Sequence, residues 1–408
     1  MNALGFAYRA RLLAVTFVTT LVMIAPPVEP RDSSHVNNFI EASVGGFHSE
    51  SQEVIHASTT LVQIDTIVTD RDGKHIRGLS AENFKIEEDN HLQRVIALDY
   101  FDASTGRSGR NGEPIFVSLT NSNDSETLRT IGFDHRLIVL FFDLTSFRSS
   151  GGGGADFDNV FRTVGAAKKF VKEKMTAADL VSVVSFGTDL LVLCGFTNDR
   201  GTVDQALDSL VPGKGALNPS LPKNMNNTLM PGTFVTGAET SLYVVNSLTE
   251  MLSQIPGRKS VIHFTDGLGS SAGGGLDRIT GAANKNNVSF YEVVAEGLCA
   301  GGPQASVGYR GDGAGMANQT SGCAQLGTLY TLAADTGGKL FTNSNDLMPF
   351  FDQVLEDSTA YYLLSYDPTN NVHDGSYRSV SVRLVGVPGG RVKSRPGYYA
   401  PSETKQGH

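Results

Sequence analysis

The chain has 408 residues, 40% hydrophobic and 18% charged, which is an ordinary globular composition with enough length for two or three domains. Its formal net charge is −9 and it has no basic cluster, so we expect no nucleic-acid partner, because binding phosphate backbones requires concentrated Lys and Arg. No segment after residue 30 is apolar enough to span a bilayer.

Residues 1–25 have the pattern of an export signal. Arg9 and Arg11 precede an unbroken apolar run that is short for a transmembrane helix. Pro26 and Pro27 follow it, a poor context for cleavage, so a cleaved signal peptide and an N-terminal anchor both stay open. We therefore expect an exported protein, periplasmic, secreted or at the cell surface, that contacts a membrane only through this segment if it is retained.

A polar linker and a small β domain are predicted next. Residues 26–58 are polar without a sustained period and indicate a linker. Residues 59–103 predict a β domain, because apolar residues alternate over 62–68 and two further strand-like runs follow around a polar tip. Residues 104–133 are again rich in Ser, Asn and Gly and predict a second linker.

Residues 134–358 alternate between strand and helix patterns, which favours a doubly wound, mostly parallel α/β sheet. The continuous apolar run over 137–142 predicts a strand buried on both faces. Two runs separated only by residues 187–189 predict an antiparallel hairpin with one strand at the sheet edge. Asp199 is expected to cap a helix.

Residues 359–402 read as β-strands separated by turns. Few-stranded sheets are marginal alone, so we expect these strands to complete a β-sandwich with residues 59–103.

Two aspartates end two of the predicted strands. Asp143 follows the apolar run, and Asp266 ends the strand in "VIHFTDG". Thr240 and Ser241 stand at a predicted helix start after a loop. Carboxyl ends of parallel strands meet at one edge of a sheet, and carboxylate and hydroxyl oxygens suit Mg²⁺. The plainer interpretations are a helix cap for the first aspartate and a turn residue for the second.

These residues resemble the metal-ion-dependent adhesion site of von Willebrand factor A (VWFA) domains, in which D-x-S-x-S follows the first strand. The counterparts here are Asp143 to Phe147, then Thr240 and Asp266. The segments "VTDRDGKHIRGLSAENFKIEEDN", "FTNDR", "PGRKSVIHFTDG" and "YYLLSYDPTN" are similar to a bacterial VWFA-related family of exported proteins, and the likeness runs from about Leu61 to Pro401.

The resemblance implies a Rossmann-like VWFA domain that acts in adhesion or protein–protein interaction, without enzyme activity or a small-molecule substrate. It implies a Mg²⁺, or alternatively Mn²⁺ or Ca²⁺, that takes an acidic side chain from a partner protein. The implied metal ligands are Asp143, Thr145, Thr240 and Asp266, with Ser146 and Ser241 as additional members of the shell.

Phe147 departs from the family pattern, because an aromatic ring cannot replace the second serine as a Mg²⁺ ligand. A water could replace that ligand. A metal-binding site and a degenerate site that keeps only the fold both stay open. Phe147→Ser is expected to increase the affinity for the metal, and an unchanged affinity would mean that Phe147 does not face the site.

Two other functions are compatible with this sequence. The same fold could bind a partner without metal, through the loops 211–235 and 298–322. A metal-dependent hydrolase using Asp143 is the other candidate, but phosphatases of the haloacid dehalogenase type place a second acid where Thr145 stands.

The three cysteines give no metal-binding spacing. Cys194 lies in an apolar run and is expected to be a buried thiol. Cys299 and Cys323 could form a disulfide in an oxidising compartment. The tripeptide at 310–312, Arg-Gly-Asp, lies between them and is interpreted as a chance occurrence.

Overall fold

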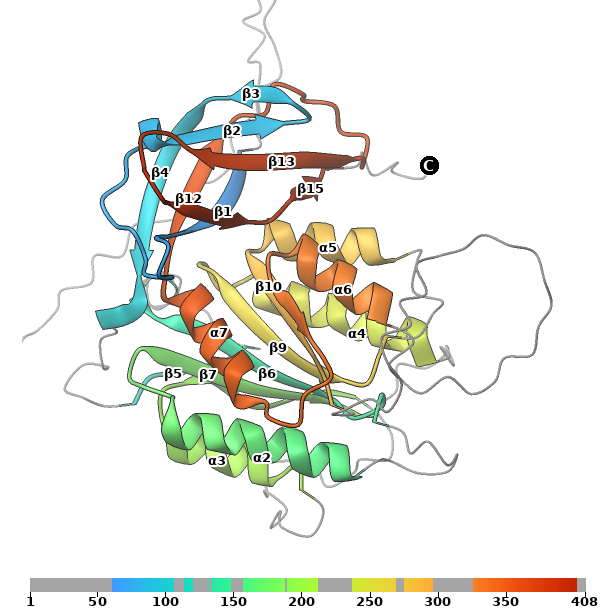
Figure 1. The fold of residues 1–408 in the computed structure, drawn as a ribbon. Helices are drawn as coiled ribbons and strands as arrows, with labels where there is room; N and C mark the ends of the chain where they lie inside the picture. The colour runs from blue at the N-terminus through green and yellow to red at the C-terminus, as the bar shows by residue number, and fades with distance from the viewer. Residues whose placement is uncertain are drawn as a thin grey trace, which may run out of the picture. The chain divides into compact units, whose positions relative to one another are not determined.

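The computed structural model describes residues 61–105, 114–119, 132, 134–147, 157–187, 189–211, 237–268, 275–295 and 326–401. The predicted export signal and the first linker lie outside these residues. The described elements form one α/β unit and two smaller β-sheets (Figure 1).

The α/β unit is built on a seven-stranded sheet with the strand order β11-β10-β9-β6-β7-β8-β5. Its strands are β5 (Phe116–Val117), β6 (Arg136–Asp143), β7 (Asp179–Phe186), β8 (Leu190–Thr197), β9 (Lys259–Thr265), β10 (Val288–Val294) and β11 (Lys339–Phe341). The strands from β11 to β7 are parallel to one another, and β8 is antiparallel to β7. The predicted mostly parallel α/β sheet is confirmed.

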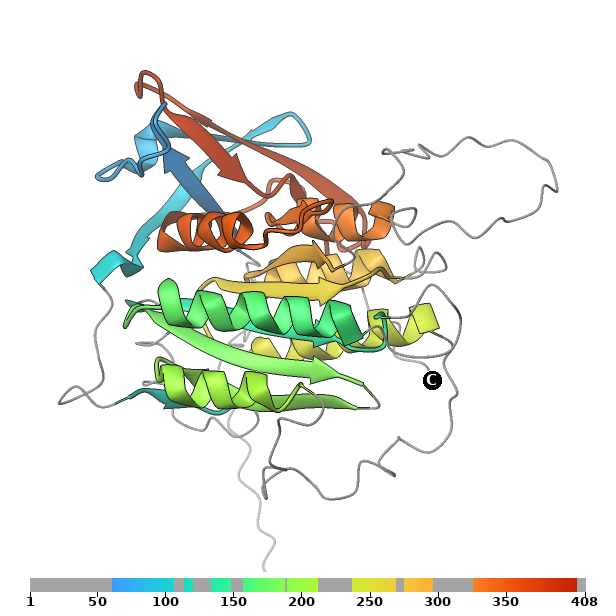
Figure 2. The ribbon, with the colours of Figure 1, turned by 60° about the horizontal axis from the view of Figure 1, so that its bottom comes forward.

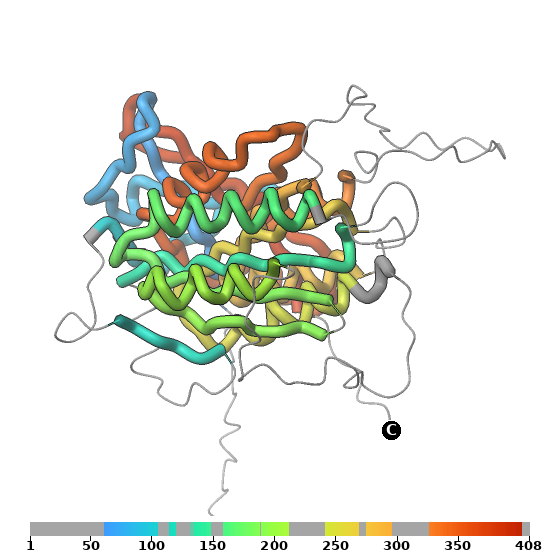
Figure 3. The backbone as a smooth tube through the Cα atoms, turned by 90° about the horizontal axis from the view of Figure 1, so that it is seen from below, coloured from blue at the N-terminus to red at the C-terminus, as the bar shows by residue number. Residues whose placement is uncertain are grey.

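Helices cover both faces of this sheet (Figure 2). One face packs against α2 (Phe157–Glu173), α3 (Arg200–Asp208) and α7 (Met348–Thr359). The other packs against α4 (Gly237–Leu252), α5 (Leu276–Lys285) and α6 (Leu326–Asp335). Figure 3 shows α2 and α3 running side by side along their face of the sheet.

Strand β6 lies at the centre and is buried along most of its length. Its side chains alternate between the two apolar clusters, with Phe141 in one and Phe142 in the other. Every second residue of a strand points to the same face, so both sets must be apolar when both faces are covered. This double burial explains the unbroken apolar run.

The sheet edge beyond β8 differs from the prediction. Strand β8 was expected at the edge, but β5, within the predicted linker 104–133, pairs antiparallel with it. Gly195 permits this pairing, since a Cβ atom there would lie 2.2 Å from the carbonyl oxygen of Val117. A two-residue strand is too short to show an alternating pattern in the sequence.

The two smaller sheets have the strand orders β14-β1-β12-β4 and β15-β13-β2-β3. Their strands are β1 (Val62–Thr69), β2 (Phe84–Glu88), β3 (His91–Gln93), β4 (Val95–Asp102), β12 (Ala360–Tyr366), β13 (Tyr377–Leu384), β14 (Arg391–Ser394) and β15 (Gly397–Tyr399). Strands from before and after the α/β unit pair directly, β1 with β12 and β2 with β13. One apolar cluster, including Ile64, Ile86, Leu364 and Val380, joins the two sheets.

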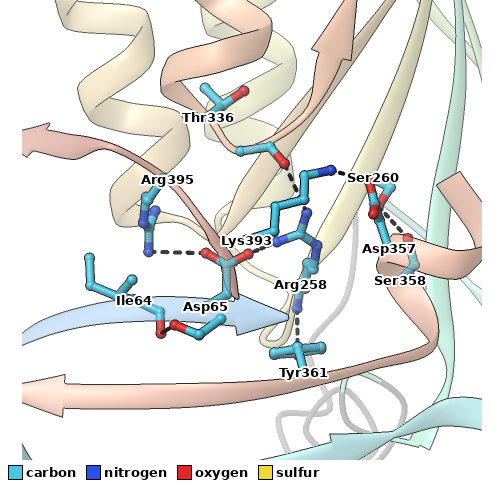
Figure 4. A network of polar contacts seen from close by, with 12 residues as sticks. Ile64, Asp65, Arg258, Ser260, Thr336, Asp357, Ser358, Tyr361, Lys393 and Arg395 are labelled. Atoms are coloured by element: carbon cyan, nitrogen blue, oxygen red, sulfur yellow. Dashed lines mark hydrogen bonds and ion pairs between the residues drawn. The ribbon is translucent and has the colours of Figure 1, made fainter. Parts of the chain in front are cut away.

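A buried polar network connects these sheets to the α/β unit (Figure 4). Asp65 of β1 forms ion pairs with Arg258, which directly precedes β9, and with Arg395, at 3.6 Å. The backbone N–H of Arg258 donates to the hydroxyl of Tyr361 at 3.1 Å. All three charged side chains are at most 4% exposed, so the network is part of the core.

Candidate functional site

Asp143 ends β6, and its side chain is held by the turn that follows. One carboxylate oxygen, Oδ1, accepts hydrogen bonds from the backbone N–H of Thr145 at 3.1 Å and from its hydroxyl at 2.6 Å. Aspartate side chains commonly bond the backbone two residues on, which produces such turns. Asp143 is 1% exposed, so these bonds compensate for most of its lost hydration.

Helix α4 brings a second hydroxyl to the same carboxylate. Ser241 donates from Oγ to Oδ2 of Asp143 at 3.2 Å, across 98 residues of sequence. The neighbouring Leu242 and Val245 pack in the core, which fixes this end of the helix against the sheet. Thr240 precedes Ser241 in α4, but its side chain lies outside the described part of the structure.

Ser146 connects the two strand ends. Its hydroxyl donates to the backbone carbonyl of Asp143 at 2.7 Å and accepts from the backbone N–H of Asp266 at 3.0 Å. Strands β6 and β9 are adjacent and parallel, so Asp143 and Asp266 lie on the same edge of the sheet. The structure therefore brings together Asp143, Thr145, Ser146, Ser241 and Asp266 at one edge of the sheet.

Helix α2 adds two residues that sequence reasoning missed. Asn159 donates from Nδ2 to Oδ2 of Asp266 at 3.0 Å. Arg162, one turn further along α2, donates from Nη2 to Oδ1 of Asn159. These polar residues lie on an ordinary helical pattern, and only the docking of α2 on the sheet places them at the site.

Phe147 does not face the site. Its side chain is 1% exposed and belongs to the apolar cluster on the α2, α3 and α7 face of the sheet. The expectation that this ring occupies the place of a metal ligand is therefore corrected: the turn directs Ser146 to the strand ends and Phe147 into the core. Apolar burial explains why an aromatic residue is favoured here.

A buried charged pair lies beneath the site. His263 of β9 and Glu292 of β10 are fully buried, with Nδ1 and Oε2 2.7 Å apart. The ring of His263 stacks on Phe141 at 4.6 Å between centroids. Burial lowers the pKa of His263, but the charge of Glu292, its hydrogen bond and the charge of Asp143 together raise it above its ordinary value. When His263 is protonated, its charge offsets part of the negative charge of Asp143.

The donor chemistry of the cluster fits a hard cation. No group of three His, Cys, Asp or Glu side chains suited to a metal occurs among the described residues. The site instead combines the carboxylates of Asp143 and Asp266 with hydroxyls of Thr145, Ser146 and Ser241. Oxygen donors of this kind, completed by water, are what Mg²⁺ uses in proteins.

Other predicted features lie partly outside the described residues. Cys194 is half-buried, less buried than the apolar run predicted, and burial raises the pKa of its thiol to about 11, which disfavours the reactive thiolate. Cys299, Cys323, the 298–322 loop with its Arg-Gly-Asp tripeptide and nearly all of the 211–235 loop are not among the described residues. Within the described ranges, no helix has the length and apolarity needed to cross a membrane.

Comparison with known proteins found distant structural likenesses only. No family model and no curated protein matches the chain. BatB from Bacteroides thetaiotaomicron is 19% identical, with 55% of this chain and 98% of that chain covered at a TM-score of 0.34. Proximal thread matrix protein 1 from the mussel byssus, with a zinc-occupied MIDAS motif, is 16% identical, with 56% of this chain and 46% of that chain covered at a TM-score of 0.34.

A third similar structure is the von Willebrand factor domain of the type V pili tip protein Mfa5 from Porphyromonas gingivalis. It is 18% identical, with 33% of this chain and 38% of that chain covered at a TM-score of 0.22. Likenesses this distant transfer no ligand, partner or activity. The fold of the described residues, a mostly parallel sheet covered by helices on both faces, is established by the strand pairing and packing of this chain itself.

Proposed function

We propose that this chain is a non-enzymatic interaction module, which docks an acidic side chain of a partner protein at the Asp143–Asp266 edge of its sheet. The observation that carries the proposal is the double hydrogen bond of Ser146, which joins the ends of β6 and β9. Three distant segments of the chain supply oxygen atoms to one small area, the arrangement that a docking cation requires.

The proposed cation is Mg²⁺, with Mn²⁺ and Ca²⁺ as alternatives. Asp143, Thr145, Thr240 and Asp266 would hold it, with Ser146 and Ser241 in the surrounding shell. Mg²⁺ retains several waters when few protein ligands bind it directly, and one of these waters can give way to a partner's carboxylate.

One observation favours binding without metal. Both carboxylate oxygens of Asp143 already accept hydrogen bonds from Thr145 or Ser241. The protein therefore holds this carboxylate in place without a cation. In that case the edge of the sheet would still recognise a partner, together with the loops 211–235 and 298–322.

A hydrolase is the weaker candidate. Thr145 stands where phosphatases of the haloacid dehalogenase type place a second acid, so a nucleophilic Asp143 would have no acid partner at that position. We also propose that the two four-stranded sheets form one sandwich from the N- and C-terminal segments, and that residues 1–25 export the protein.

Addition of Mn²⁺ or Mg²⁺ to the purified protein tests the metal-bound form. A cation that binds only the folded state stabilises it by about 2.7 kcal/mol at a concentration 100 times its Kd. We expect the melting temperature to rise by a few degrees with increasing metal. Asp143→Ala and Asp266→Ala should abolish this rise, whatever they do to stability without metal.

The matched control is Asp204→Ala, which removes an exposed carboxylate from α3 and should keep the full metal-dependent rise. No rise in the unmodified protein would overturn the metal-bound form and leave the metal-free form. Hydrolysis of a generic phosphate ester that Asp143→Ala abolishes would instead establish an enzyme.

A further inference from the structure

We propose that Asn159 and Arg162 are positioning residues for the candidate metal site, with Arg162 fixing the amide of Asn159 so that it holds Asp266. The two residues lie one turn apart at the start of α2, on the surface that faces the end of β9. This inference rests on the proposed cation binding at Asp143 and Asp266.

The chemistry of the three groups permits one orientation of the amide. A guanidinium can only donate hydrogen bonds, and an ionised carboxylate can only accept them. Asn159 therefore has to turn Oδ1 toward Arg162 and Nδ2 toward Asp266, as observed. Because Asn159 is buried, a reversed amide would set an oxygen against the carboxylate, with little water to compensate.

The position of Arg162 suits this role. It is half-buried at the helix surface, and its second terminal nitrogen donates to Oδ1 of Asn345 at 3.5 Å. The guanidinium is thus held between two amide oxygens. Its positive charge and the positive end of α2 both attract the carboxylate of Asp266.

The consequence concerns the metal affinity of the site. Groups that orient a ligand without touching the metal typically contribute 10- to 100-fold to metal affinity. A fixed Asp266 carboxylate would not need to be reoriented when a cation binds. Without the amide, Asp266 would have more freedom and the cation would have to order it.

The experiment measures the Kd of Mn²⁺ alone, from the electron paramagnetic resonance signal of free Mn²⁺, in four variants and the unmodified protein. Asn159→Ala and Arg162→Gln should each weaken Mn²⁺ binding by about 10-fold or more. Arg162→Lys should stay near the unmodified protein, because lysine can only donate and so preserves the amide orientation. Glutamine both donates and accepts, so it cannot impose that orientation.

The control is Lys169→Gln, which removes a positive charge from an exposed position on the same helix and should leave the Kd unchanged. Equal affinities for Arg162→Gln and Arg162→Lys, or an unchanged Kd in folded Asn159→Ala, would overturn the inference.

A result in which the unmodified protein binds no Mn²⁺ would refute the metal form of the proposed function, and a second measurement would then decide the inference. Melting temperatures of Asn159→Ala, Asp266→Ala and the double variant give the coupling between the two residues. Strictly additive losses would overturn the proposed contact, whereas a smaller effect of Asn159→Ala in the Asp266→Ala background would support it.

Discussion

Adjacent residues have opposite roles at Ser146 and Phe147. The serine hydroxyl joins the two strand ends, while the phenylalanine ring is buried in the core. The sequence resemblance aligned Phe147 with a family ligand and suggested a damaged site. The backbone of the turn determines which residue lies at the site, because it directs Ser146 toward the strand ends and Phe147 into the core.

Phe147→Ser should therefore destabilise the protein and not increase its affinity for metal. Removing a buried phenylalanine ring typically costs 3–5 kcal/mol, so we expect the free energy of unfolding in urea to fall by about 4 kcal/mol. The control is Phe161→Ser at a residue of α2 that is 47% exposed, where the change should be small. Tighter Mn²⁺ binding by folded Phe147→Ser would show that this residue does reach the site.

At the scale of elements, the strands β9 and β10 carry a fully buried histidine–glutamate pair. His263 and Glu292 face each other in register and lie on the sheet face that α4, α5 and α6 cover. Burial of two charges is costly and is repaid only by good geometry. The pair lies close enough to Asp143 for the charges of His263 and Asp143 to interact, so the protonation of His263 affects the electrostatic potential at the site.

The pH dependence of stability should reveal this pair. Folding raises the pKa of His263. Its contribution to the free energy of unfolding is therefore fully present below about pH 6.5, the pKa of histidine in the unfolded chain, and is lost as the pH rises through the pKa in the folded protein. The double variant His263→Leu, Glu292→Leu should lack this loss. Urea unfolding between about pH 6 and about pH 9 measures the difference from the unmodified protein.

The pH profile of stability has to be compared between the double variant and the unmodified protein, because Lys259 changes stability with pH in the opposite direction. Burial lowers the pKa of Lys259 to about 7, so the unfolded chain binds more protons above that pH and stability rises with pH. The exposed His373→Ala is the control and should keep the unmodified profile. An identical pH profile in the double variant would contradict the role of His263.

At the scale of the whole described molecule, Asp65 joins the smaller sheets to the α/β unit. Its carboxylate lies between two buried arginines, one from each part. Burial and the neighbouring Arg258 lower the pKa of Arg395 to about 10, so it remains charged at neutral pH. The two arginines depend on Asp65 as their counter-ion, because both side chains are almost completely buried away from water.

Asp65→Ala should destabilise the protein by about 3–5 kcal/mol, the usual cost of leaving a buried charge without its partner. Thermal unfolding followed by circular dichroism measures this loss. The control is Asp72→Ala in the exposed turn after β1, where little change is expected. A similar melting temperature for both variants would mean that the network does not hold the two parts together.

Local patterns in the sequence predicted much of the architecture. Apolar runs and helical spacing predicted the parallel sheet, the hairpin of β7 and β8 and the helices, and Asp199 caps α3 as expected. The prediction that Asp143 and Asp266 share an edge also followed from the sequence, because each ends an apolar strand. These features depend on residues close together in the chain, so a single sequence is sufficient.

The sequence by itself determined the covered parallel sheet and the two acidic strand ends, because burial and strand ends leave periodic patterns. Tertiary structure alone decided that Phe147 is buried in the core, that Asn159 of α2 holds Asp266 and that β5 extends the sheet. These outcomes depend on how distant segments dock, and docking depends on shape and hydrogen-bond partners that no local pattern specifies.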